Sequence, residues 1–320
     1  ILDEKSKKTK IFFMFNKVQK ILVTDDYVGQ RLDNYLINLL KGVPKSKIYS
    51  IIRKGEVRIN GSRKKPSYKL AHGNEIRIPP LQYLNDKGKE DFIPTDLVNL
   101  LKDRIIYEND DYLAINKPEG IASHGGSGIK IGLIETIRNF GKNYRECKLI
   151  HRLDKDTSGC QIVSKKQSFL RKCNEEIRLG KSFKEYLVIV HGEWPSERKE
   201  ISSYLIKTKN SRGENYVKEN EDGKKSVSKF KVIKHSKNIT KLSCNIITGR
   251  THQIRVHCSS VGNFVIGDVK YGNRELSKFY KHFGRMFLHS HRLEIPSLSL
   301  SICAEEPESF KKILKFDETL

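Results

Sequence analysis

The densest group of reactive side chains lies between His151 and Gly159, in the segment H-R-L-D-K-D-T-S-G. A carboxylate such as Asp154, placed in a charged loop beside the apolar stretch 160–163, can serve as a nucleophile or a general base. The same composition is also typical of a solvated turn that Asp156 or Thr157 caps. Residue types alone therefore leave a catalytic loop and an ordinary turn both open.

A second charged segment, residues 248–257, reads T-G-R-T-H-Q-I-R-V-H. An arginine from this segment could pair with Asp154 and keep the carboxylate ionised at neutral pH, because an opposite charge favours the charged form. His252 and His257 are five residues apart, which is not the spacing of a zinc-binding pair on one helical face. Together the two segments make a candidate catalytic site, and we expect no metal in it.

These two segments resemble the signature motifs of the RluA-type pseudouridine synthases. Residues 116–120 (N-K-P-E-G) resemble the first motif of that family, and residues 184–187 (K-E-Y-L) resemble its tyrosine-bearing strand. Residues 41–46 (K-G-V-P-K-S) and 124–128 (H-G-G-S-G) are most similar to the RluC subgroup. The motifs follow the family order over residues 105–300. Val188 and Ser290 stand where alanine is usual, away from the reactive positions.

The resemblance implies a catalytic trio. Asp154 would be the essential carboxylate, attacking the anomeric carbon of the sugar, attacking the uracil ring, or assisting a glycal route. Arg255 would pair with Asp154 and orient it. Tyr186 would lie against the uracil and serve as a general base, although by itself a tyrosine in an alternating strand is more typical of a core.

The resemblance also implies residues that contact RNA. A uridine inside a helix must be flipped out before it can react, and Arg152 would fill the space that it leaves. The planar guanidinium suits this role because it can stack on a base and also donate hydrogen bonds. His151 would brace the loop, while Lys117 and Arg250 are candidates for contacts with phosphate groups.

Two other classes of function stay open at this point. A non-catalytic ribosome-assembly or RNA-binding protein would need only the surface of such a domain, yet it would not need all three catalytic residues. A glycosidase acting on nucleic acid would pair Asp154 with Asp156 and release free base. Isomerisation needs neither a redox cofactor nor an energy source, and the sequence has no G-x-x-x-x-G-K-[ST] or G-x-G-x-x-G motif. We therefore expect no cofactor and no bound nucleotide.

The elements that must position these residues are mostly strands. Apolar–polar alternation predicts strands near 105–107, 112–115, 186–190, 227–233, 242–247 and 287–295, and helical periodicity marks 131–140 and 168–179. Because no βαβ rhythm connects them, we predict an α+β fold in which the catalytic domain, residues 105–320, is built on a largely antiparallel β-sheet.

The N-terminal quarter carries a disproportionate share of the positive charge. The 320-residue chain has 61 basic and 38 acidic side chains, a net of +23, and residues 1–80 hold 18 of the former and 7 of the latter, a net of +11. Two predicted helices (31–40 and 46–54) and short strands near 56–59 and 75–78 form a small α/β unit that resembles the alpha-L domain of ribosomal protein S-four. The expected RNA contacts are Lys45, Lys47, Arg53, Lys54 and Arg58.

The sequence predicts four regions: an N-terminal tail (1–20), the alpha-L RNA-binding domain (21–80), a linker (81–104) and the catalytic domain (105–320). Six cysteines without a C-x-x-C pair indicate reduced thiols, and no apolar run is long enough to span a membrane. We therefore expect a cytosolic monomer whose partner is large-subunit ribosomal RNA.

Overall fold

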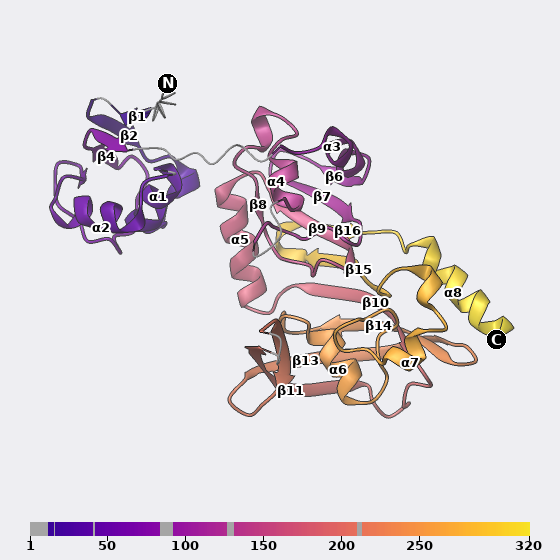
Figure 1. The fold of residues 1–320 in the computed structure, drawn as a ribbon. Coiled ribbons are helices and arrows are strands. Elements are labelled where there is room, and N and C mark those ends of the chain that lie inside the picture. Colours follow the sequence, from indigo (N-terminus) through magenta and orange to yellow (C-terminus); the bar gives the residue numbers. More distant parts are fainter. Residues whose placement is uncertain (1–11, 16, 41, 84–91, 127–130, 210–212) are drawn as a thin grey trace, which may run out of the picture. The chain divides into compact units, whose positions relative to one another are not determined.

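The computed structural model describes residues 12–15, 17–40, 42–83, 92–126, 131–209 and 213–320. The chain divides into two compact units, residues 1–92 and 93–320. Figure 1 follows both units along the sequence. No helix in the described ranges is long and apolar enough to cross a membrane.

Unit 1 buries one hydrophobic core between two helices and a three-stranded antiparallel sheet of order β2-β4-β3. Leu32 and Leu36 from the first helix meet Ile48, Ile51 and Ile76 in that core, which explains the helical spacing of the apolar residues. Both predicted helices are confirmed, and the predicted strand at 56–59 is shorter. The elements are β1 (Phe12–Phe15), β2 (Gln19–Leu22), α1 (Leu32–Leu39), α2 (Lys45–Arg53), β3 (Arg58–Ile59), β4 (Glu75–Ile78) and β5 (Leu81–Tyr83).

The borders of the predicted tail and linker differ from the structure. Within the expected tail, β1 pairs antiparallel with β5, and β2 already begins at Gln19. Within the expected linker lie β5 and α3 (Thr95–Lys102), whose Leu97 and Leu101 pack against the core of unit 2. Sequence periodicity did not reveal these elements, because β1 and β5 are too short to show alternation and α3 has only two turns. Residues 1–11, 16 and 84–91 lie outside the described ranges.

Unit 2 is organised by one large mixed sheet, of order β12-β11-β13-β14-β10-β15-β9-β7-β6, with β16 beside β15 and β8 beside β9. The pairings are antiparallel apart from β9 and β15, which run parallel. The predicted α+β class and the largely antiparallel sheet are therefore confirmed. The strands are β6 (Ile105–Glu108), β7 (Tyr112–Lys117), β8 (Lys148–Leu149), β9 (Ser158–Ser164), β10 (Phe183–His191), β11 (Glu200–Lys209), β12 (Asn215–Glu219), β13 (Lys224–His235), β14 (Ile239–Ile246), β15 (Leu288–Ile295) and β16 (Leu300–Cys303).

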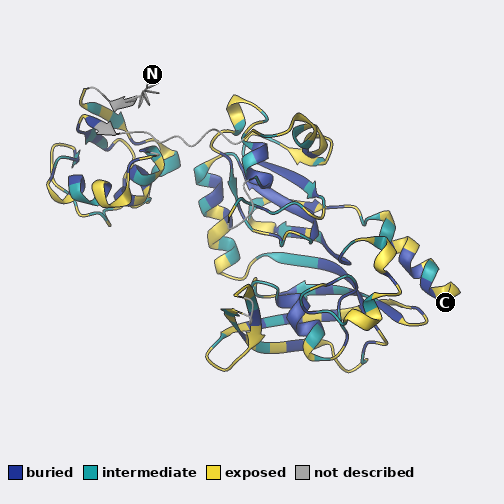
Figure 2. Cartoon of the chain, in the orientation of Figure 1, coloured by how far each residue is buried: buried dark blue, intermediate teal, exposed yellow. Residues whose placement is uncertain are grey.

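Helices flank this sheet. The α5 helix lies against β9 and β15, and α6 lies against β11, β12 and β13. Figure 2 shows the central strands as the most buried part of the unit, with exposed residues gathered on the helices and the outer strands. Besides α3, the α-helices of this unit in the described ranges are α4 (Leu133–Ile137), α5 (Gln167–Arg178), α6 (Gln253–Ser260), α7 (Arg274–Ser277) and α8 (Glu308–Thr319).

Candidate active site

The loop that carries Asp154 enters β9 through a close contact with β15. Gly159 has φ +111°, and a Cβ atom on it would lie 2.2 Å from the carbonyl oxygen of Ser290. Only glycine allows both this backbone conformation and this approach. The parallel pairing of β9 and β15, with Ser290 opposite Gly159, therefore fixes where the loop leaves the sheet.

Buried hydrogen bonds hold the same loop from below. The Leu153 amide donates to Ser123 Oγ at 2.9 Å and to Gln161 Oε1 at 3.2 Å. His151 Nε2 accepts the Ile162 amide at 3.1 Å, and burial lowers the pKa of His151 to about 3. A neutral His151 thus braces the loop, as the sequence predicted, and Asp154 extends from a rigid base.

Arg255 projects from α6 and is held mainly by an aspartate that the sequence analysis did not single out. Its Nε and Nη2 each donate to a different oxygen of Asp268 at 2.7 Å, a bidentate geometry that fixes the guanidinium plane. The amides of Lys270 and Tyr271 also donate to Asp268. The Arg255 guanidinium lies 5.0 Å from the centre of the Tyr271 ring. The cation is therefore fully oriented before any substrate arrives.

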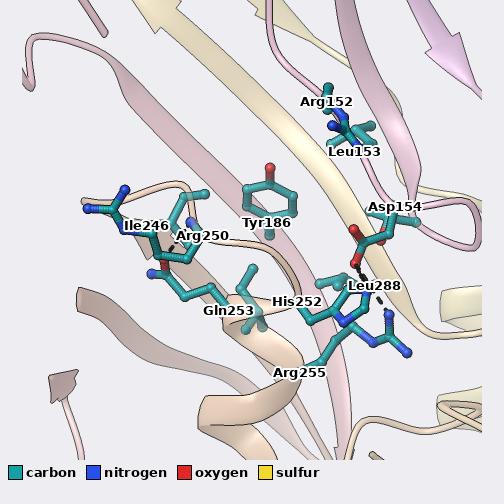
Figure 3. Close-up of a pocket in the computed structure, with 12 residues that line it drawn as sticks. Arg152, Leu153, Asp154, Tyr186, Ile246, Arg250, His252, Gln253, Arg255 and Leu288 are labelled. Carbon is teal, nitrogen blue, oxygen red and sulfur yellow. Dashed lines mark hydrogen bonds and ion pairs between the residues drawn. The ribbon is translucent and has the colours of Figure 1, made fainter. Parts of the chain in front are cut away.

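Asp154 completes this cluster. The third nitrogen of Arg255, Nη1, donates to Asp154 Oδ2 at 3.3 Å, and His252 Nε2 lies 3.8 Å from the same oxygen. The Asp154 side chain remains 27% exposed, whereas that of Arg255 is only 7% exposed. Figure 3 shows both contacts at one side of a cavity of about 60 Å³. The predicted pairing of Arg255 with Asp154 is present, with the carboxylate still accessible.

Burial and charge shift the pKa values of Arg255 and Asp268 in opposite directions. Burial by itself lowers the pKa of Arg255, but its hydrogen bonds and charge attraction to Asp268, with a smaller share from Asp154, raise the pKa overall. Burial raises the pKa of Asp268, and the bonds from Arg255 more than reverse this, so that its pKa is lowered. Both groups are consequently ionised at neutral pH.

Tyr186 lies on β10 in the same cavity, with the Ser290 backbone opposite it on β15. Its side chain is buried, and burial raises the pKa of its phenol well above the usual range, although a hydrogen bond with Ser290 opposes the shift. The phenol is therefore protonated at neutral pH. The role of Tyr186 as a general base stays a prediction.

Two of the three predicted RNA-contact residues near the site fit that role by position, and one does not. Arg152 and Arg250 are exposed and line the cavity. Lys117 is completely buried, with Nζ donating to the carbonyls of Pro118, Ile121 and Lys155. A phosphate cannot reach an ammonium group at this depth, so the predicted contact is wrong. Lys117 instead ties two loops together.

The predicted RNA contacts in unit 1 lie on and beside α2. Four are exposed side chains, and Arg58 is half-buried with Nη1 donating to the carbonyl of Gly61 at 3.1 Å. Two of the lysines occupy the first turn of α2, where the partial positive charge of the helix end disfavours cations. The described exposed residues of this group are Lys45, Lys47, Arg53 and Lys54.

Three side chains of the site were missed or misjudged by the sequence analysis: Asp268, Tyr271 and His252. His252, considered only as a metal ligand, has the left-handed φ of +54° at the start of α6, and its Nδ1 lies 2.7 Å from the hydroxyl of Tyr271. The spacing of Asp268 and Tyr271 signals nothing by itself. The strain at His252 becomes visible only in the backbone.

Comparisons with known proteins agree with this architecture. The RNA pseudouridylate synthase family matches residues 111–260, and the S4 domain matches residues 30–76. The chain belongs to the RNA pseudouridylate synthase family, whose members are isomerases.

Individual relatives cover nearly the whole chain. Ribosomal large subunit pseudouridine synthase C of Yersinia pestis is 43% identical, with 91% of this chain and 92% of the relative covered. The protein of the same name from Escherichia coli K12 is 44% identical, with 87% and 88% covered. The solved structure of human RNA pseudouridylate synthase domain containing 1 has a TM-score of 0.52 and 26% identity, with 63% of this chain and 83% of that chain covered.

Proposed function

We propose that this protein converts uridine to pseudouridine in large-subunit ribosomal RNA, with Asp154 as the reacting carboxylate. The relatives that match along most of the chain carry that substrate in their names. The observation that carries the assignment of Asp154 is its geometry: an accessible carboxylate whose partner cation is already oriented by a second, buried aspartate.

The contacts of Asp154 suggest how it would meet the substrate. Arg255 and His252 both approach Oδ2, so Oδ1 is the oxygen that we expect to face the uridine. Pairing with Arg255 orients the carboxylate, which a nucleophile requires. Attack on the anomeric carbon, attack on the uracil ring and assistance to a glycal route all begin from this arrangement.

Tyr186 would act as a surface for the base. Its buried ring offers the extruded uracil an aromatic neighbour, and its protonated hydroxyl can donate a hydrogen bond to a uracil carbonyl. We propose Tyr186 both as a contact for the uracil and as the general base of the reaction.

Access to the cavity would require base flipping. A base that remains stacked in a helix cannot reach a carboxylate that lines a cavity. Arg152, exposed on the Asp154 loop, is positioned to occupy the vacated stack, and the cations on α2 would hold the surrounding RNA. We propose that the protein does this as a cytosolic monomer without a cofactor.

The experiment compares Asp154→Asn with Asp156→Asn on an unmodified transcript of large-subunit ribosomal RNA. Asp154→Asn keeps the side-chain volume and removes the reactive charge, so we expect pseudouridine formation to fall by more than a thousandfold with RNA affinity nearly unchanged. Asp156→Asn is the matched control, two residues along the same loop, and should stay within a few-fold of wild type. Carbodiimide-dependent stops in primer extension measure the product.

The outcomes separate the alternatives. A glycosidase would lose activity in both variants, and wild type would release free uracil. A non-catalytic RNA-binding protein would produce no pseudouridine in any form. Turnover of Asp154→Asn within tenfold of wild type would remove Asp154 from the chemistry.

A further inference from the structure

A second and larger cavity lies next to the one that holds Asp154. Its volume is about 440 Å³, against about 60 Å³ for the Asp154 cavity. Its walls come from β11, β12, the turn before β13, and the loop 249–251 that precedes α6. Arg250 lines both cavities, and in Figure 3 its guanidinium points away from Asp154. The two spaces therefore adjoin across a single exposed arginine.

The chemistry of this larger cavity is divided between an apolar floor and a cationic rim. Leu205 on β11 and Val217 on β12 are buried, at 5% and 4% exposure. Lys207, Lys224 and Arg250 are exposed around them. A floor that excludes water beside cations that attract phosphate is the combination that binds a nucleotide of single-stranded RNA.

The cavity also contains one acid. Asp222 is exposed at the turn before β13. A carboxylate repels phosphate but accepts hydrogen bonds from the N–H groups that every uracil, cytosine, adenine and guanine edge can offer. Asp222 therefore supplies an acceptor for a base edge, and the three cations supply contacts for a phosphate group. The volume is within the range of sites for small organic molecules.

We propose that this cavity binds one unpaired nucleotide of the RNA strand, a neighbour of the target uridine, while the target itself occupies the Asp154 cavity. The proposal rests on the proposed function, because the position beside the target has meaning only if the protein acts on RNA. Holding a neighbour separately would keep the strand open beside the reacting residue and so stabilise the flipped state.

The test uses photo-crosslinking to the full-length protein. The probe is a 12-nucleotide oligouridine in which 4-thiouridine replaces uridine, and adducts are mapped by mass spectrometry of peptides. Gly249→Phe would fill the cavity, and Gly249→Ala is its control. A Cβ atom at Gly249 meets no atom within 4 Å, and no positive φ constrains this residue. A second pair compares Lys207→Glu at the rim with Lys231→Glu, an exposed lysine further along β13.

We expect wild type and Gly249→Ala to give adducts on peptides containing residues 205–207 or 249–251, and Gly249→Phe to reduce those adducts at least fivefold. Lys207→Glu should reduce them as well, and Lys231→Glu should not. Adducts confined to unit 1 and the Asp154 cavity, or an equal yield from Gly249→Phe and Gly249→Ala, would overturn the proposal. Asp154→Asn should crosslink as wild type does, so the loss of pseudouridine formation and the loss of this binding site are separate results.

Discussion

The two units carry positive charge in different ways. In unit 1 the lysines of α2 are exposed and stand at the end of the helix where its dipole opposes them, a cost that folding alone does not explain. In unit 2 the decisive cation, Arg255, is buried and locked by Asp268 before substrate arrives. Exposed charge gives long-range attraction that salt screens, whereas buried charge gives fixed orientation that salt scarcely affects. The comparison leads us to expect that unit 1 contributes mainly to RNA affinity and that unit 2 carries the chemistry.

The largest effect should follow from breaking the buried pair. Asp268→Ala leaves Arg255 with only the partly exposed Asp154, so we expect unit 2 to lose about 3–5 kcal/mol of stability and pseudouridine formation to fall at least a hundredfold. The fluorescence of Trp194, the only tryptophan in the chain and buried in unit 2, follows urea unfolding of this unit.

The control for that variant is Asp111→Ala, which removes the carboxylate from the exposed Lys166–Asp111 pair of the same unit. An exposed pair contributes about 0–1 kcal/mol, so this change should be small. Equal losses from Asp268→Ala and Asp111→Ala would contradict the idea that Arg255 depends on its buried anchor.

The next effect concerns the exposed lysines. Replacing Lys45, Lys47 and Lys54 together by alanine should weaken RNA binding and reduce the slope of log affinity against log salt by roughly 2–3, because each phosphate contact contributes about 0.9 in a helix. The matched control replaces Lys311, Lys312 and Lys315, three exposed lysines on α8. If both triple variants shift the slope equally, the positive charge of unit 1 has no special place in binding.

A smaller effect would distinguish flipping from chemistry within unit 2. Arg152→Ala should lower kcat/KM for a structured hairpin about tenfold more than for a linear strand of the same sequence, because only the hairpin requires unstacking. Arg152→Lys should rescue little, since an ammonium group neither stacks nor forks its hydrogen bonds. Identical losses on both RNAs would assign Arg152 to the reaction step or to folding.

The last effect depends on pH and comes from the buried Lys117. Burial lowers its pKa from 10.5 to about 7, against weaker opposition from Asp156 and Asp154. Between pH 7 and about 10 the native state has released the proton that the unfolded state still holds, so this group makes stability rise with pH. The contribution is at most about 1.4 kcal/mol per pH unit. The Lys117→Met variant should not show this rise of stability with pH. Parallel curves of unfolding free energy against pH for wild type and variant would show that Lys117 keeps an ordinary pKa.

Local pattern was enough to predict the helices of unit 1 and the central strands of unit 2, because their apolar spacing is also their burial pattern. The outer strands β11 and β12 were not predicted, since few of their residues are apolar or buried. Lys117 was misplaced because residue type indicated a surface, although it continues the alternation of the buried Leu113 and Ile115 along β7.

The candidate site also has parts that local sequence predicts and parts that it does not. The pairing of Asp154 with Arg255 could be predicted because each stands in a distinctive motif. The role of Asp268 could not be predicted, because it depends on a loop that returns to the side of α6 where Arg255 lies. Nothing in the spacing of residues 266–272 indicates that return. The parallel contact of β9 with β15 is likewise a property of two segments about 130 residues apart.

Arg255 contacts both Asp268 and Asp154, and this double contact matters during turnover. If Asp154 forms an ester with the sugar or the base, it ceases to be an anion, and a guanidinium that depended on it would be left as an uncompensated buried cation. Arg255 retains its two bonds to Asp268 throughout. The buried Arg255–Asp268 pair is therefore neutral in sum whether Asp154 is a free carboxylate or an ester, and breakdown of such an ester would restore the starting arrangement without moving the arginine.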